Sequence, residues 1–474
     1  MKKTYIALAL FIMGLTTISC KKFLDINKDP NHPTSVSEAL ILSPVEVTMA
    51  TSVVGGYNGT IAAYWMQQLS LNQPPPNAET YRITPVDVDN TWSYYIYPNT
   101  LENLKDLTFQ AEAAGHNEYA AIGKALLAFN FAIATDIWGD IPFSEALQIE
   151  KYLKPKYDNQ EAIYAGIQNL LDSGIYYANQ PSSGVVPGSD DYIYGGDMDK
   201  WKKFMYMLKA RFYLRLTKAP GRTASNQADS ALNALANGFA SNDDNAFVPY
   251  PGSPSAENPW YMNTLPGAGG VVLAASFVDS LKSRNDPRLP VIAAKANDGS
   301  YTGRKSGEDA SPDPTAFSSV NTFYGGYLPL DESNSAGAGA NLYLATYTEQ
   351  LFIKAEATFI KSGAAAATPI YQAAIAAHMQ MLGVDGSAYI ASRGPLTSAN
   401  GLEQIITEKY VADFLSIETY NDWRRTGFPR LTLAQNAYVN YIPRRWPYGN
   451  TTILTNPQPQ QSLTTKDPVW WDKQ

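Results

Sequence analysis

The only cysteine of the chain, Cys20, is the side chain whose type and position most clearly indicate covalent chemistry. It follows a start that is typical of an export signal, with two lysines and then an apolar run over residues 5–15. That run is shorter than the roughly 20 residues of a membrane-spanning helix. Small or apolar residues lead directly to the thiol, and the pattern resembles a bacterial lipobox, in which the cysteine is acylated. The sequence predicts a signal peptide over residues 1–19 and lipidation of Cys20; an ordinary secretory signal that leaves a free thiol is the alternative.

Other patterns that could carry chemistry are missing from the sequence. The histidines show no HExxH spacing, one cysteine makes no CxxC pair, and no P-loop, Rossmann fingerprint or G-x-S-x-G elbow occurs. We therefore predict no catalytic residue, no cofactor and no metal, although a structural Ca²⁺ held by loop oxygens is left open. Paired acids in loop-like segments are expected to be solvated, and a glycosidase that uses two facing acids stays an alternative. His116 and His378 fall in helical stretches and are expected at the surface or at helix caps.

Aromatic side chains in two loop-like regions are the candidates for ligand contact. An aromatic ring suits the C–H face of a pyranose, while Asn, Asp, Arg and Tyr hydroxyls suit its hydroxyl rim. One region covers residues 72–97, and the other covers residues 258–263 together with 301–327. Packing of the same rings inside the loops is the alternative for each of them. The candidates are Tyr81, Trp92, Tyr94, Trp260, Tyr261, Tyr301, Tyr324 and Tyr327.

The composition restricts the class of ligand. The formal net charge is −8, and no block of basic residues occurs, which argues against nucleic acid as a partner. Charged residues are only 17% of the chain, whereas Tyr and Trp number 31 and 9. Few charges and many aromatics beside Asn and Gln favour a neutral, polar ligand such as a sugar, with an aromatic-rich core as the alternative.

The elements that must position these residues are mainly α-helices. Apolar residues recur at steps of three and four along much of the first 240 residues, which indicates antiparallel helix pairs stacked as in a helical repeat. The same spacing returns after residue 340. The expected helices cover residues 60–71, 88–111, 119–137, 160–178, 200–217, 228–235, 271–283, 344–359, 368–381 and 402–416.

Two stretches lack this periodicity. Residues 240–340 are rich in Gly, Pro, Ser, Asn and Asp but also carry aromatics, so we expect a long ordered loop region around the helix at 271–283. The tail over residues 421–474 is rich in Pro, Arg and Trp, so we expect it to wrap the helical body. No linker is long enough to separate two domains. We expect one domain over residues 20–474 with a loop-rich insertion at about 240–340.

Several segments together resemble the SusD/RagB family of surface lipoproteins. They occur in the family's order from one end of the chain to the other, which makes the set specific although each motif alone is weak. The motifs are CKKFLDIN (Cys20–Asn27) with Asp29–Asn31, DIWGDIPFSEAL (Asp136–Leu147), DKWKKF (Asp199–Phe204) with LKAR (Leu208–Arg211), NDPRLP (Asn285–Pro290), YTE (Tyr347–Glu349) with FIKAE (Phe352–Glu356), NDWRRTG (Asn421–Gly427), IPRR (Ile442–Arg445) and VWWD (Val469–Asp472).

The resemblance implies a mainly α fold with tetratricopeptide-like helix pairs and an irregular, loop-rich ligand-binding face. It also implies a binding protein and not an enzyme, anchored by lipid to the outer membrane and facing the cell exterior. Such a protein captures an oligomeric nutrient, here expected to be a glycan, and delivers it to a SusC-like TonB-dependent transporter. The alternatives are a peptide ligand, a surface glycoside hydrolase, and a helical-repeat scaffold with no small ligand. Most of the matched motifs are expected to be structural, with Arg424 and Arg425 packing and ion-pairing the tail against the helices.

Overall fold

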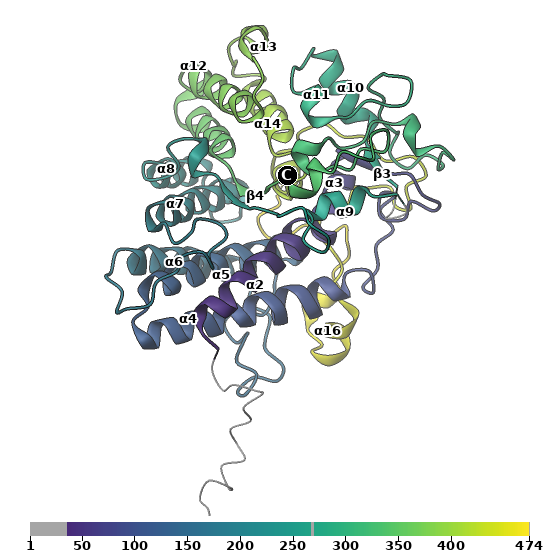
Figure 1. Cartoon of the computed structure of the whole chain (residues 1–474). Helices are drawn as coiled ribbons and strands as arrows, with labels where there is room; N and C mark the ends of the chain where they lie inside the picture. Colours follow the sequence, from purple (N-terminus) through teal and green to yellow (C-terminus); the bar gives the residue numbers. More distant parts are fainter. Residues whose placement is uncertain (1–35, 267–269, 474) are drawn as a thin grey trace, which may run out of the picture.

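The computed structural model describes residues 36–266 and 270–473, and its main feature is a stack of antiparallel helices (Figure 1). Cys20 and the predicted signal peptide lie outside the described residues. Neighbouring helices of the stack pack in sequence order, α4 on α5, α5 on α6, α6 on α7 and α7 on α8, and α12 then packs on α8 and α14. The mainly α expectation is confirmed. The stack contains α2 (Glu38–Thr48), α4 (Asn103–Ala114), α5 (Asn117–Trp138), α6 (Gln160–Ala178), α7 (Met198–Arg215), α8 (Ala224–Leu235), α12 (Tyr347–Leu382) and α14 (Gly401–Ala412).

Helix α5 lies at the centre of the stack because almost its whole surface is apolar. Two helical stretches, Glu38–Trp65 and Asn117–Trp138, are long and apolar enough to cross a membrane by length and composition alone. The second of these is α5, and 94% of its most apolar window is buried inside the molecule. The stripe that the sequence predicted for residues 119–137 is buried throughout. Its length and hydropathy are therefore accounted for by the core that α4, α6 and the chain's tail form around it.

Several element boundaries differ from those predicted. The helix expected at 60–71 ends early, because α3 (Tyr57–Trp65) is followed by strand β1 (Leu69–Leu71). The helix expected at 271–283 begins as strand β3 (Val271–Leu273), and only Ala275–Ser283 is helical, as α10. β1 and β3 pair antiparallel, with Ser70 opposite Val272. The apolar runs in these strands carry no signal that separates a short buried strand from a helix end.

The helices expected at 88–111, 344–359 and 368–381 also have different forms. The first begins as a π-helix over Thr91–Glu102 and continues as α4. The other two are parts of α12, which is kinked at Gly363, a residue with φ 78° and ψ −177°. Only glycine adopts that conformation without strain, so the kink is set by this residue.

The loop-rich segment over 240–340 is ordered by short elements, and it lies beside the stack on the side that carries β3 (Figure 1). Strand β2 pairs antiparallel with β4, which leads directly into α12. One buried apolar cluster extends from Leu42 to Trp471 and includes residues of this segment. The elements are β2 (Ala246–Val248), α9 (Pro259–Thr264), β3, α10, α11 (Leu289–Ile292) and β4 (Leu342–Ala345).

The tail wraps the helical body, as predicted. After α15 (Glu418–Thr426), the backbone N–H of Trp446 donates to the carbonyl of Ile137 at the end of α5, at 3.1 Å. The Trp471 indole donates to Asp136 at 2.9 Å. Arg425 makes a bidentate ion pair with Glu356 of α12. Short helices α13 (Ser387–Arg393) and α16 (Asn450–Thr455) complete the described chain.

Candidate ligand-binding site

The eight aromatic residues predicted to contact ligand divide into buried and accessible side chains. Five are at most 8% exposed, namely Tyr81, Trp92, Trp260, Tyr324 and Tyr327. Tyr94 is 58% exposed, and Tyr261 and Tyr301 are partly exposed. The assignment of these side chains to a ligand stays a prediction.

The buried rings have partners inside the protein. Trp92 packs edge-on against Trp138 with ring centroids 4.9 Å apart, and the Tyr81 hydroxyl accepts a hydrogen bond from the backbone N–H of Ala434 at 3.0 Å. The hydroxyl of Tyr324 lies 3.1 Å from Nε2 of His378. In the conformation described, these contacts give the rings a packing role.

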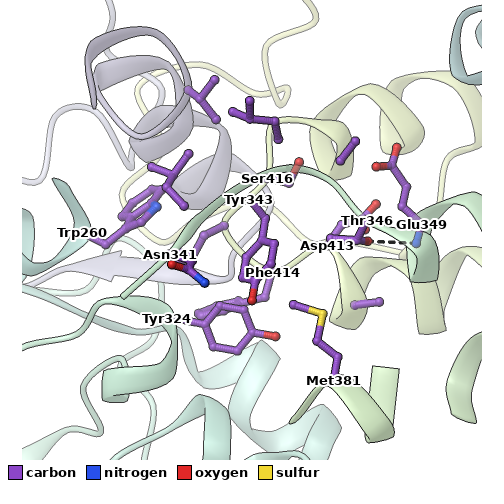
Figure 2. A pocket seen from close by; sticks show the side chains of 16 residues that line it. Trp260, Tyr324, Asn341, Tyr343, Thr346, Glu349, Met381, Asp413, Phe414 and Ser416 are labelled. Atoms are coloured by element: carbon purple, nitrogen blue, oxygen red, sulfur yellow. Dashed lines mark hydrogen bonds between the residues drawn. The ribbon is translucent and has the colours of Figure 1, made fainter. Parts of the chain in front are cut away.

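Trp260 and Tyr324 line one end of a small cavity (Figure 2). Its free volume is about 60 Å³, far below the roughly 300–1,000 Å³ of small-molecule sites. At its other end Asp413 is held by the Lys409 ammonium at 2.6 Å, and burial raises the pKa of the Asp413 carboxyl. A buried acid with a raised pKa is a pattern that also occurs in catalytic sites. Here the cavity is too small for a sugar ring, so we interpret it as a packing defect of the core.

A groove of about 700 Å³ lies where three loops meet, on the side of the molecule that carries β3. The loops are residues 74–82, 307–310 and 436–438, and the first two belong to the two aromatic regions that the sequence singled out. The fold therefore brings those regions together. We call this cavity the Tyr438 groove. Its lining is Pro74, Pro75, Pro76, Asn77, Thr80, Arg82, Gly307, Asp309, Ala310, Asn436 and Tyr438.

The lining of the Tyr438 groove combines an aromatic ring with a polar rim. Tyr438 is 69% exposed, and the Arg82 guanidinium lies over its ring, 5.5 Å from the centroid. Arg82 has no acidic partner among the described residues, so its donors are available. Asn77, Asp309 and Asn436 are exposed and add amide and carboxylate groups. An accessible ring beside several donors and acceptors is an arrangement that suits a sugar.

A buried ion pair holds the first two loops of the groove together. The Arg304 guanidinium, which is fully buried, donates to the Glu79 carboxylate at 3.0 Å and to the Ser70 hydroxyl at 2.8 Å. It also donates to the carbonyl of Glu308. Burial raises the pKa of Glu79, and the hydrogen bond from Ser70 and the charge of Arg304 oppose that shift. Removal of either partner would leave a buried charge without compensation, so the pair fixes the spacing of these loops.

Backbone hydrogen bonds hold the third loop against the other two. The N–H of Tyr438 donates to the carbonyl of Thr80, and the N–H of Gln435 donates to that of Ser306, each at 2.8 Å. The Asn436 amide donates to the carbonyl of Gly307 at 3.1 Å. The shape of the groove is therefore fixed by the protein's own hydrogen bonds between the three loops.

Sequence reasoning missed Asn436 and Tyr438. They lie in the tail, which was assigned a wrapping role, and about 350 residues separate Tyr438 from the Tyr81 region. A tyrosine within a polar, aperiodic segment was the only local signal.

A metal site has no comparable arrangement of side chains. Within residues 36–266 and 270–473, no three His, Cys, Asp or Glu side chains lie close enough together to bind a metal ion.

Comparisons with known proteins agree with this fold. The chain matches the SusD-like family model, described as starch-binding and associating with the outer membrane, over residues 30–449. It is similar in structure to a chitin-binding protein, with a TM-score of 0.77 and 22% identity over 92% of this chain and 100% of that one. A SusD/RagB family protein from Bacteroides thetaiotaomicron has a TM-score of 0.76 and 24% identity over 92% and 99%. A SusD homologue from Bacteroides fragilis has a TM-score of 0.71 and 21% identity over 93% and 100%. No protein with a curated description matches the sequence.

Proposed function

Because the chain belongs to the SusD-like family of outer-membrane-associated binding proteins, we propose that it captures a glycan at the cell surface in the Tyr438 groove. The observation that carries the proposal is the accessible Tyr438 ring with the Arg82 guanidinium over it, in a groove of about 700 Å³. One structural neighbour is a chitin-binding protein, which supports a saccharide as the ligand class.

The groove favours binding over hydrolysis. A glycosidase that uses two acids needs both of them beside the scissile bond. Among the described residues, Asp309 is the one carboxylate that lines the Tyr438 groove, and it is exposed. We therefore propose that the protein holds its ligand without changing it. Incubation of an oligosaccharide with the purified protein should return it uncleaved, and turnover that is lost in Asp309→Asn would contradict this.

The ligand class is tested with immobilised glycans and with the variant Tyr438→Ala. Loss of the ring removes the stacking surface, so we expect the Kd for a bound oligosaccharide to rise at least about tenfold, or 1.4 kcal/mol. Calorimetric titration measures this. Tyr176→Ala is the matched control, because Tyr176 is 61% exposed on α6, away from the groove, and its loss should leave the Kd unchanged. Binding of peptides with no glycan binding would overturn the proposal.

We also propose the surroundings in which this capture takes place. Lipid on Cys20 would hold the protein at the outer membrane, facing the exterior, and a SusC-like TonB-dependent transporter would receive the ligand. Family membership supports this arrangement. The variant Cys20→Ala should release the protein from membranes. Affinity purification of the wild type from its own cells should recover a TonB-dependent transporter in stoichiometric amount, and a purification that yields none would count against the partnership.

A further inference from the structure

A second groove, of about 680 Å³, lies between the end of α2 and the loop that follows β2. Its walls are residues 47–52, residues 249–257 and Tyr192. None of them lines the Tyr438 groove, so the two cavities are built by different segments. We call it the Tyr192 groove. Its size falls within the range of small-molecule sites.

Local contacts fix the walls of the Tyr192 groove. The backbone N–H of Tyr192 donates to Glu46 at 2.7 Å, which ties this residue to α2 and leaves its side chain 44% exposed. The hydroxyls of Tyr250 and Thr51 are hydrogen-bonded at 2.8 Å, which joins the opposite wall to the same helical segment. Prolines on both sides of Tyr250 restrict the backbone there. One accessible aromatic ring is thus presented by a fixed scaffold.

Four polar side chains of the groove have no partner among the described residues. The carboxylate of Glu257 is partly exposed and makes no hydrogen bond or ion pair with any residue that the structure describes. The hydroxyls of Thr48, Ser52 and Ser255 likewise make none within the described ranges. Three free hydroxyls and a carboxylate around an aromatic wall supply donors and acceptors for a polyhydroxylated ligand.

The charge of this groove is negative. The described residues that line it include Glu257 and no lysine or arginine. Asp190 and Asp191 directly precede Tyr192 in the chain and add two acidic residues next to it. The Tyr438 groove differs in this respect, because its lining balances the Asp309 carboxylate with the Arg82 guanidinium, which lies over the aromatic ring. A cationic group would therefore be attracted to the Tyr192 groove and repelled from the ring of the other.

We propose that the Tyr192 groove is a second ligand site, which binds a saccharide unit that carries a free ammonium group. The C–H face of the sugar stacks on Tyr192, the ammonium pairs with Glu257, and the ring hydroxyls bond to the hydroxyls of the rim. A lysine side chain would satisfy Glu257 but would leave the rim hydroxyls unpaired. The inference takes from the proposed function only that the ligand is a saccharide.

The test is a calorimetric titration of the purified full chain with a glucosamine trimer, beside an N-acetylglucosamine trimer that lacks the charge. We expect the glucosamine trimer to bind more tightly, and Glu257→Gln and Tyr192→Ala each to raise its Kd about tenfold or more. Both side chains are accessible, so both variants should fold, as their circular dichroism will show. Glu150→Gln is the matched control for the charge change, because Glu150 is exposed and lines neither groove.

The variants separate this proposal from the previous one. Tyr438→Ala should leave the affinity for the glucosamine trimer unchanged. Equal affinity for the two trimers, or loss of glucosamine binding in Tyr438→Ala but not in Glu257→Gln, would overturn the second site and leave the first standing. Binding of a lysine-rich peptide with no binding of the glucosamine trimer would also overturn it.

Discussion

At the scale of single residues, His378 shows how a buried side chain makes stability depend on pH. Its ring is 0% exposed, with Nδ1 3.2 Å from the Arg288 guanidinium and Nε2 3.1 Å from the hydroxyl of Tyr324. Because a guanidinium can only donate, Nδ1 accepts and the ring is neutral. Burial, followed by the charge of Arg288, lowers the pKa of His378 well below its ordinary value of 6.5.

This gives a prediction about acid. In the unfolded chain His378 takes up a proton near pH 6.5, whereas in the folded protein it does not, so the free energy of unfolding falls as the pH drops below that value. The contribution is up to about 1.4 kcal/mol per pH unit. Urea unfolding at a series of pH values should show that slope reduced by about this amount in His378→Gln.

His116→Gln is the control, because His116 is half-buried beside Glu38 at the start of α5 and lies far from Arg288 in sequence. In His116→Gln the part of the pH dependence of the free energy of unfolding that His378 causes should be the same as in the wild type. Parallel pH profiles for the wild type and His378→Gln would contradict the prediction.

How far single residues could be predicted depended on where their partners lie. The packing role of Arg424 and Arg425 followed from their motif and is confirmed, since Arg424 lies over the ring of Trp471 and Arg425 pairs with Glu356. The position expected for His378, at the surface or at a helix cap, is wrong, because this residue is buried within α12. Its burial depends on Arg288 and Tyr324, which a helical pattern around residue 378 does not reveal.

At the scale of elements, the Tyr438 groove depends on a loop contact that only glycine permits. Gly307 has φ +78°, and a Cβ placed there would lie 1.9 Å from the carbonyl oxygen of Gln435. Gly307→Ala must therefore push the third loop away from the second. We expect the Kd for a bound oligosaccharide to rise at least about tenfold, because Tyr438 moves with that loop.

Gly299→Ala separates this effect from backbone strain. Gly299 has φ +80°, but a Cβ there would meet nothing within 4 Å. Both variants should lose about 1 kcal/mol of stability from the positive φ, whereas Gly299→Ala should bind like the wild type. Equal affinities in titrations of the two variants would show that the loop contact does not shape the groove.

Long helices were predicted well and short strands were not. The helix at 160–178 has the predicted bounds as α6, because a continuous 3.6-residue periodicity identifies it within a single segment. β1 and β3 were missed, since each has three residues and its partner lies about 200 residues away. The residue pattern of either segment alone therefore does not predict a partner so far away in the chain.

At the scale of the whole molecule, the end of the chain closes the core around α5. The Trp471 side chain is 0% exposed, and the guanidinium groups of Arg424 and Arg215 lie 4.6 and 5.3 Å from its ring centroid. Trp471→Ala would leave a large cavity and would remove one of the hydrogen bonds that the Asp136 carboxylate accepts. We expect a loss of about 3–5 kcal/mol in the free energy of unfolding, measured with urea.

The neighbouring Trp470 is the matched control. It is only partly buried, so Trp470→Ala should cost about 1 kcal/mol. Similar losses in the two variants would mean that the tail does not seal the core in the way described.

The overall architecture could be recognised from ordered motifs, whereas the groove could not. Those motifs are largely the residues that hold the body together, such as Asp136, Arg211 and Trp471. The lining of the Tyr438 groove comes from loop tips whose positions depend on the finished fold. Its composition can therefore differ between proteins that share the body.

The hydrogen bond between Trp471 and Asp136 has a consequence for biosynthesis. The two residues are 335 positions apart, so at about 5–20 residues per second the ribosome makes the second some tens of seconds after the first. During that time the apolar surface of α5 has been made but its cover has not. Since the sequence also predicts an export signal, we expect the chain to depend on a holding chaperone until it has been exported, and fragments that stop before residue 438 to have no Tyr438 groove at all.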